Sequence, residues 1–194
     1  MRKCKLAVII LVILFATVIF AACARGSAAP QELITEIRED LTAASRLIIT
    51  AEVTADYGDR VYTFGIRYTG NIESGEILIT SPELIAGVVA EISGGCAALV
   101  FDGARLETGA LSGSGLTPIE ALPLLMSEWQ GGRIGFTGFE KFGDHDAVTM
   151  ESLVDESVTK KTWFDRTTLL PLRAELSYNG TMIIAAEFSG FVIE

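Results

Sequence analysis

The sequence predicts an α+β fold, with one long antiparallel sheet and two helices that cover one of its faces. Most of the 194-residue chain consists of short β-rich runs. Three of the turns between these runs are two-residue pairs: Gly94-Gly95, Asp102-Gly103 and Asn179-Gly180. Strands joined by such turns are antiparallel, because a parallel pair needs a longer crossover. Two other segments have helical apolar spacing, and a loosely fitting helix would leave an apolar cavity beside the sheet.

The first residues predict an exported protein. Three cations precede an uncharged apolar run at residues 6–20, and small residues then lead to Cys23, which is the order of an export signal. The run is shorter than the roughly twenty residues that a membrane-spanning helix prefers. Residues 20–23, Phe-Ala-Ala-Cys, resemble the lipobox of bacterial lipoproteins, in which the cysteine is acylated, although an aliphatic residue usually stands where Phe20 does. We expect a lipoprotein signal peptide at 1–22 and lipidation of Cys23; the alternative is an uncleaved signal anchor.

Either alternative places the folded part at the extracytoplasmic face of the cell membrane. Residues 23–30 are expected to form a lipidated tether and residues 31–194 a single domain. The signal peptide holds three of the 15 Lys and Arg and none of the 25 Asp and Glu, so its removal changes the net charge from −10 to −13. That charge repels nucleic acid and anionic headgroups, so we expect no nucleic-acid partner and a membrane contact made through the N-terminal lipid.

The cysteines exclude a domain built on disulfides. Cys4 lies in the signal peptide and Cys23 is the expected lipid site, which leaves Cys96. One cysteine can form neither an internal disulfide nor a cysteine metal cluster. Cys96 lies in the apolar stretch GGCAALVF, so we expect a buried small residue there and not a nucleophile.

The first helix is expected at about residues 31–44. Apolar residues recur there at helical spacing among charged ones: Leu33, Ile34, Ile37, Leu41 and Ala44. Pro30 suits the first helical turn, and acidic residues near that end interact favourably with the helix dipole.

Strand signals dominate the next part of the chain. Residues 47–69 are expected to form a hairpin around Tyr57-Gly58-Asp59, and residues 76–80 a further strand. Residues 87–109 contain three short strands separated by the two glycine-containing turns. Residues 175–188 give the strongest hairpin, because the Asn-Gly pair within them suits a type I′ turn. That pair also begins a glycosylation sequon, but in a chain with a bacterial lipoprotein signal the turn is the better explanation.

The second helix is expected in the segment LTPIEALPLLMSEWQGG, residues 116–132. Thr117 and Glu120 have capping-box spacing, with Pro118 at the first helical position. Pro123 removes an internal hydrogen bond, so we expect a kinked or two-part helix. Its apolar stripe is equally consistent with core packing and with the lining of a hydrophobic cavity: Ile119, Leu122, Leu125, Met126 and Trp129.

The segment TWFDRTTLLPLRAEL, residues 162–176, has the composition of a reactive motif but is better interpreted as a corner of the sheet. Asp165 is expected to accept hydrogen bonds from the turn backbone between two strands. The second strand is expected to alternate inward and outward residues, with the inward side made by four apolar residues: Leu170, Leu172, Ala174 and Leu176.

Signals for catalysis are weak, and we expect no enzyme, no catalytic residue, no metal and no cofactor. His145 has Asp144 and Asp146 beside it and Glu140 nearby, which would suit a small metal site or a general base. A turn leading into a strand explains them better, because the two aspartates would then point away from the histidine. The serines of ALSGSGL lack the spacing and context of a nucleophile elbow. A pair of glycosidase carboxylates is neither supported nor excluded.

Two segments, SGLTPIEALPLLMSEW and TWFDRTTLLPLRAELSYNGTMIIAAEFSGFVI, resemble the LolA/LolB-like lipoprotein-carrier superfamily. The likeness extends over about residues 31–193 and is closest to extracytoplasmic lipoproteins of Gram-positive bacteria, including the clostridial germination lipoprotein group. The resemblance implies a half-open β-barrel, or strongly curved sheet, with both helices against its concave face. Carriers of this kind hold acyl chains in an apolar concavity. A lipid anchor argues against a freely diffusing shuttle.

Two functions follow as expectations. The first is a membrane-anchored, non-enzymatic lipoprotein that binds lipid, acyl chains or a lipoprotein in its apolar concavity. The alternative is an interaction or regulatory lipoprotein of the cell envelope, similar to germination lipoproteins or envelope-stress sensors, which binds a protein partner and holds no ligand.

Overall fold

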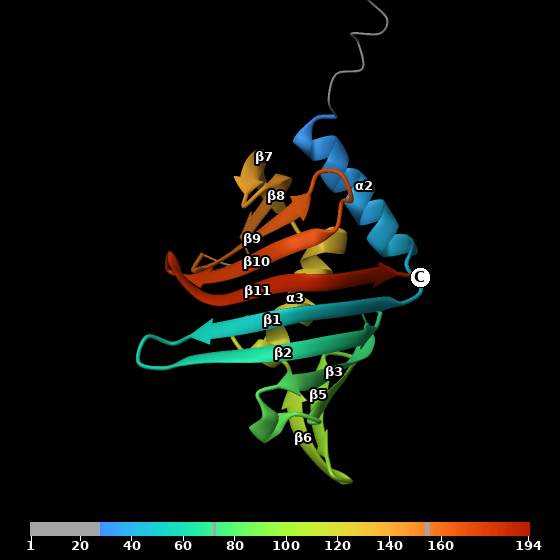
Figure 1. The fold of residues 1–194 in the computed structure, drawn as a ribbon, viewed down its shortest axis with the longest axis vertical. Coiled ribbons are helices and arrows are strands. Elements are labelled where there is room, and N and C mark those ends of the chain that lie inside the picture. The colour runs from blue at the N-terminus through green and yellow to red at the C-terminus, as the bar shows by residue number, and fades with distance from the viewer. Residues whose placement is uncertain (1–27, 72, 154–155) are drawn as a thin grey trace, which may run out of the picture.

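A computed structural model describes residues 28–71, 73–153 and 156–194. Within these residues, eleven strands form one antiparallel sheet with two α-helices against one face (Figure 1). The prediction of an α+β fold with one long curved antiparallel sheet is confirmed. The expected signal peptide at 1–22, the lipidation site Cys23 and most of the expected tether lie outside the described residues.

The helices are α2 (Pro30–Ala43) and α3 (Pro118–Gly131), and a short 3-10 helix, η1, covers Glu83–Ile85. The strands are β1 (Leu47–Asp56), β2 (Val61–Gly70), β3 (Ser74–Ser81), β4 (Val89–Ser93), β5 (Cys96–Phe101), β6 (Ala104–Ala110), β7 (Ile134–Phe142), β8 (His145–Leu153), β9 (Val158–Asp165), β10 (Pro171–Tyr178) and β11 (Thr181–Ile193).

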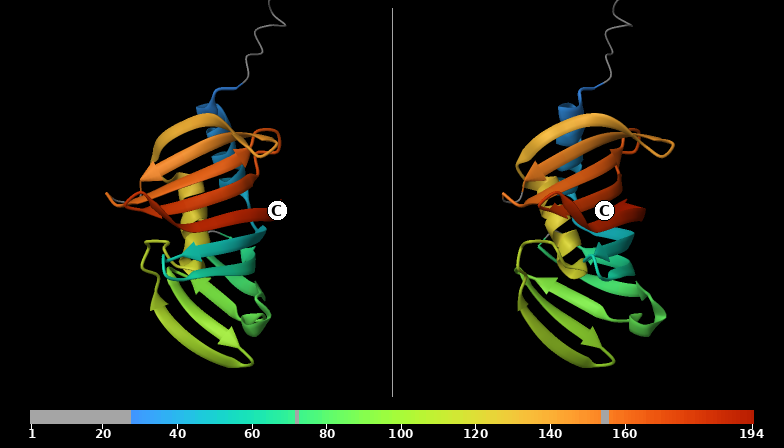
Figure 2. Two further views of the ribbon diagram at one scale, coloured as in Figure 1. Left: turned by 60° about the vertical axis from the view of Figure 1, so that its left-hand side comes forward. Right: turned by 90° about the vertical axis from the view of Figure 1, so that its left-hand side faces the viewer.

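The chain builds the sheet in two halves. The strand order is β6-β5-β4-β3-β2-β1-β11-β10-β9-β8-β7, so β6 and β7 form the two edges. From β1 the chain proceeds outward to β6, α3 then carries it to the opposite edge, and β7 to β11 return to the centre. There β11 pairs with β1, from Leu47 opposite Ile193 to Ala55 opposite Ile184. Figure 2 shows the sheet curving around α3, which therefore lies in its concave face.

The turns have the geometry that the residue pairs predict. Asn179 and Gly180 both have positive φ, at 49° and 78°, and Asp102 and Gly103 have 47° and 77°. Positive φ at both central positions is the requirement of a type I′ turn, which matches the twist of the strands on either side. The hairpins predicted at these pairs are confirmed.

The first helix begins and ends within one residue of its predicted bounds. Pro30 occupies its first turn, and Ile34, Ile37 and Leu41 form its buried face. This face packs against α3 and against β7 and β8. Burial of one apolar stripe therefore holds α2 over one half of the sheet.

The second helix is confirmed, but it is one continuous element and not two parts. Thr117 caps it, because its Oγ1 accepts a hydrogen bond from the Glu120 backbone N–H at 3.3 Å. The Glu120 carboxylate accepts instead from the backbone N–H and the hydroxyl of Ser112, which ties the preceding loop to the helix. Pro123 costs a single internal hydrogen bond, and burial of the side chains on both sides of it keeps the helix continuous.

The core lies between the helices and the concave face of the sheet, and it runs in sequence from Ile34 to Ala186. A chain that starts at residue 24 therefore contains the whole described core. The prediction that Cys96 is buried is wrong: its side chain is exposed. Cys96 begins β5 opposite Ser93, whereas the next residue, Ala97, is the buried one. A one-residue difference in register selects the opposite face of the strand.

The corner at residues 162–176 is confirmed as a strand, a turn and a strand. Phe164 points into the core, and the Trp163 side chain on the other face donates from Nε1 to Glu140 Oε2 at 2.9 Å. The predicted alternation holds for Ala174 and Leu176.

The alternation fails at the start of β10. The register shifts between Pro171 and Arg173, so that Pro171 is buried while Leu170 and Leu172 are partly exposed. A proline cannot donate to the ladder, and an irregularity at the start of the strand accommodates it.

Candidate hydrophobic site

The concave face of β2, β3 and β4 carries a row of apolar side chains on each strand. Strand register places Phe64 and Ile66 of β2 on this face, with Ile79 opposite Ile66 and Ala90 opposite Ile77 on the neighbouring strands. Because neighbouring residues of a strand point to opposite faces, one apolar row per strand is sufficient to build this surface.

A cavity of about 190 Å³ lies between this surface and the first turn of α3. Its wall is made by eight residues: Phe64, Ile66, Ile77, Ile79, Ala90, Thr117, Pro118 and Ile119. Five of them come from β2, β3 and β4, and three come from the cap and first turn of the helix. The cavity exists because α3 meets this part of the sheet with its end only, so no further helical turn fills the space.

The five residues predicted as cavity lining occupy two environments. Ile119 lines the cavity and is partly exposed. The other four, Leu122, Leu125, Met126 and Trp129, are each about 1% exposed and belong to the packed core. Whether any of the five contacts a ligand stays a prediction.

Trp129 illustrates how fully the rest of α3 is packed. Its ring makes edge contacts with Phe164 and Phe188 at centroid distances of 5.7 and 5.6 Å. Its Nε1 donates to Thr162 Oγ1 at 2.9 Å. A buried indole with its N–H satisfied is a stable core residue, and a ligand would have to displace it to reach this region.

The apolar surface continues beyond the cavity to the edge of the sheet. Leu99 follows Ala90 across the ladder, and Leu106 lies opposite Leu99 on β6. Phe101 and Leu106 are 51% and 63% exposed. The charged residues of this region, Glu91, Arg105 and Glu107, point to the other face, where Arg105 pairs with both carboxylates.

Sequence reasoning missed the strand side of the cavity. The alternation of Ile77 and Ile79 was visible in the sequence, but the same alternation describes any half-buried strand. Only the position of the helix end distinguishes a cavity wall from ordinary core, and residue spacing does not contain that position.

A buried ion pair under the other half of the sheet also had no sequence signal. Lys160 on β9 is 2% exposed, and its Nζ lies 2.9 Å from Glu128 Oε1 on α3. Burial lowers the pKa of Lys160, and the attraction of Glu128 offsets this only in part. The pair fixes the C-terminal part of α3 to the sheet.

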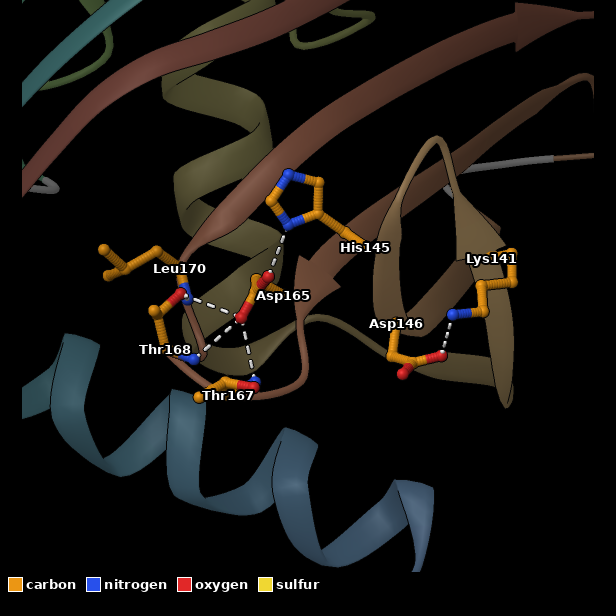
Figure 3. A network of polar contacts seen from close by, with 7 residues as sticks. All are labelled: Lys141, His145, Asp146, Asp165, Thr167, Thr168 and Leu170. Carbon is orange, nitrogen blue, oxygen red and sulfur yellow. Dashed lines mark hydrogen bonds and ion pairs between the residues drawn. The ribbon is translucent and has the colours of Figure 1, made fainter.

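The histidine region is a structural corner in this fold (Figure 3). His145 Nδ1 lies 2.8 Å from Asp165 Oδ2, and Asp165 Oδ1 accepts from the backbone N–H groups of Thr167 and Thr168. Asp146 is directed to Lys141 instead, at 2.8 Å. Within the described ranges, no three His, Cys, Asp or Glu side chains are grouped closely enough to hold a metal ion.

The Asp165 carboxylate holds this corner together. Partial burial raises its pKa, but the hydrogen bonds from Thr168, His145 and Thr167 outweigh burial, so that the net pKa lies below its ordinary value. A carboxylate held in its charged form connects the turn after β9 to the start of β8.

Comparison of the sequence with models of protein families gives no match, and comparison with curated proteins gives none either. The fold does match solved structures. A domain from Vibrio parahaemolyticus described as an outer membrane lipoprotein-sorting protein is 13% identical, covers 83% of this chain and 91% of its own, and has a TM-score of 0.50.

Two further solved structures have a fold similar to that of this chain. A conserved protein from Thermus thermophilus is 9% identical, with 84% of this chain and 86% of its own covered and a TM-score of 0.53. A DUF1329 family protein from Desulfovibrio piger is 12% identical, with 87% and 93% covered and a TM-score of 0.50. The chain therefore has a LolA-like lipoprotein-carrier fold, as its sequence predicts.

None of the helices in the described part of the chain has both the length and the apolar character needed to cross a bilayer.

Proposed function

We propose that this protein is a non-enzymatic, lipid-anchored extracytoplasmic lipoprotein that binds an acyl chain in its apolar cavity. The observation that carries the proposal is the cavity of about 190 Å³ between the first turn of α3 and strands β2 to β4. The lipoprotein-carrier fold supports it, because the resemblance to this superfamily implies an apolar concavity that holds acyl chains. Acylated Cys23 is the proposed anchor.

The volume limits what can bind. An engineered apolar cavity of about 150 Å³ in another protein stays dry and accepts benzene. The cavity here therefore suits one apolar chain end, and each methylene that it removes from water contributes about 0.8 kcal/mol. A longer chain would continue over partly buried Leu99 to exposed Phe101 and Leu106.

A neutral probe tests this function. We expect residues 24–194 to bind a linear fluorescent polyene alcohol, and to lose this binding in Ile79→Trp, which fills the cavity from its wall. Leu78→Trp is the matched control, because Leu78 is the neighbouring residue of β3 and points to the outer face. Urea unfolding of both variants establishes that they are folded.

Two outcomes contradict the proposal. One is the absence of probe binding together with the absence of lipid copurifying with the protein, as analysed by mass spectrometry. The other is equal loss of binding in both variants. The first outcome would favour the alternative, an envelope protein that binds a partner without a ligand.

The anchor has its own test. In a bacterial host that acylates lipoproteins, we expect incorporation of radioactive palmitate into the full chain and its loss in Cys23→Ser. Cys4→Ser is the matched control and should leave labelling unchanged. Undiminished labelling of Cys23→Ser would refute the lipobox assignment.

A further inference from the structure

A series of three aromatic rings connects the cavity wall to solvent. Phe64 lines the cavity, and the Tyr62 ring stacks beside it with a centroid distance of 6.4 Å. The Tyr57 ring follows at 6.3 Å from Tyr62. Tyr57 and Tyr62 are 47% and 40% exposed, so the series passes from a partly buried ring to the open surface.

The outer end of this series lies against the loop that leads into α3. The Tyr57 hydroxyl donates to the Leu116 carbonyl oxygen at 3.0 Å. Leu116 directly precedes Thr117, which lines the cavity. Tyr57 and Tyr62 thus form a border of the cavity. Their ring faces are apolar and their hydroxyl groups reach water, which is typical of tyrosine where an apolar site meets solvent.

One guanidinium group lies at this border. Arg60 Nη1 is 3.5 Å from the Tyr62 hydroxyl, which places it on the concave side of β2. Asp56 lies opposite Val61 and therefore points to the outer face, where its Oδ1 accepts from the Gly58 N–H at 2.8 Å. Within the described residues Arg60 forms no ion pair, although the chain has 25 acidic residues.

We propose that the ligand is an anionic amphiphile, whose carboxylate or phosphate contacts Arg60 while its chain passes over Tyr62 and Phe64 into the cavity. The inference rests on the proposed function and specifies its substrate class. A guanidinium presents several N–H donors in a planar fork that matches carboxylate and phosphate oxygens. An apolar cavity alone would accept any chain end, so Arg60 supplies the selectivity for charge.

The net charge of the chain opposes an anionic ligand at long range. Salt screens such repulsion beyond about 8–10 Å, so the charge in direct contact with the headgroup decides the preference. Because Arg60 is close to solvent, its contribution is that of an exposed ion pair, which corresponds to at most about a fivefold change in affinity.

Two probes with the same apolar chain but different headgroups distinguish the contribution of the headgroup charge from that of the chain. We expect residues 24–194 to bind a linear polyene fatty acid about three- to fivefold more tightly than the corresponding alcohol. Arg60→Gln should abolish this preference, because it removes the positive charge in contact with the carboxylate. Arg67→Gln should keep it, because Arg67 lies on β2, the strand that follows Arg60, but points to the outer face. Raising the salt concentration should reduce the preference in the unaltered protein.

Equal affinities for acid and alcohol in the unaltered protein would overturn the inference and leave the proposed function standing. If Arg60→Gln and Arg67→Gln changed the preference for the acid equally, the inference would also be overturned and the proposed function would still stand. Binding of neither probe would overturn both. Oleate and oleyl phosphate, used as competitors of the polyene alcohol, show whether a carboxylate or a phosphate is the preferred headgroup.

Discussion

The two halves of the sheet use the same strand pattern but differ in what covers them. Over β8 to β11 the concave face is covered, and Phe164, Leu176 and Ile184 are fully buried beneath the helices. Over β2 to β6 the same face ends in a cavity and then in exposed Phe101 and Leu106. Both halves carry large apolar side chains on this face, so the difference comes from the helices.

Helix length accounts for this difference. Eleven strands at a spacing of about 4.8 Å extend over about 48 Å along the curve of the sheet. α3 has 14 residues and is about 21 Å long at 1.5 Å per residue. α2 packs on α3, β7 and β8, so both helices cover the same half of the sheet. The opposite half is left with apolar surface that a ligand can occupy.

The largest contrast between the halves should appear when one side chain near each end of α3 is replaced by alanine. Trp129→Ala removes a fully packed ring and should lower the free energy of unfolding by about 3–5 kcal/mol. Ile119→Ala should cost about 1 kcal/mol, because this side chain is already partly exposed beside a void. Urea unfolding measures both. Equal losses would mean that the halves are packed alike.

The buried ion pair gives the second contrast. Glu128→Gln leaves Lys160 without its partner carboxylate and should cost about 3 kcal/mol near neutral pH. The matched control is Glu151→Gln, whose exposed pair with Lys161 at 3.1 Å should contribute less than about 1 kcal/mol.

The pH dependence of this loss follows from the direction of the Lys160 pKa. The pKa of Lys160 in the folded state lies below the ordinary 10.5. At pH values between these two pKa values the unfolded chain binds more protons than the folded protein, so the free energy of unfolding rises with pH. Glu128→Gln removes the charge that holds the pKa up, so its deficit should shrink as the pH is raised from neutral towards 10.5. Urea unfolding across this range is the measurement, and a deficit independent of pH would contradict the assignment.

The smallest effect is expected at the histidine corner, which lies at the outer end of the covered half. Asp165→Asn should cost about 1 kcal/mol, because the turn loses a charged acceptor. The Asp165 pKa is lowered by folding, so this contribution is present above about pH 3.9 and is lost as the pH falls through the folded-state value. Thermal unfolding across that range measures it. Asp146→Asn, on the exposed pair with Lys141, should cause no measurable change.

The structure also changes which substitutions test ligand binding. The sequence placed Leu125 and Trp129 on a stripe that suited either core or cavity, and both are completely packed. A charged residue at either position would unfold the protein, so loss of ligand there would not identify a binding site. Ile79 lies at the cavity wall and is partly exposed, and it is therefore the better position.

The sequence by itself determined the local elements, because their causes are local. A type I′ turn needs only Asn179 and Gly180, a helix cap needs only Thr117, and the apolar stripe of α2 is visible at 3.6-residue spacing. The sequence also contained enough of the overall pattern to predict the lipoprotein-carrier fold. It was wrong at Cys96 and at Leu172, where a single register step exchanges the two faces of a strand.

Only the tertiary structure decided where the cavity lies and which charges meet. The cavity depends on where the end of α3 stops over β2 to β4, and Lys160 on a strand meets Glu128 on a helix far from it in sequence. These positions depend on the curvature and strand order of the whole sheet, and the spacing of residues in the sequence does not determine them. The same non-local geometry brings Arg60 and the tyrosine pair to the border of a cavity whose far wall, at Ile119, comes from a distant helix.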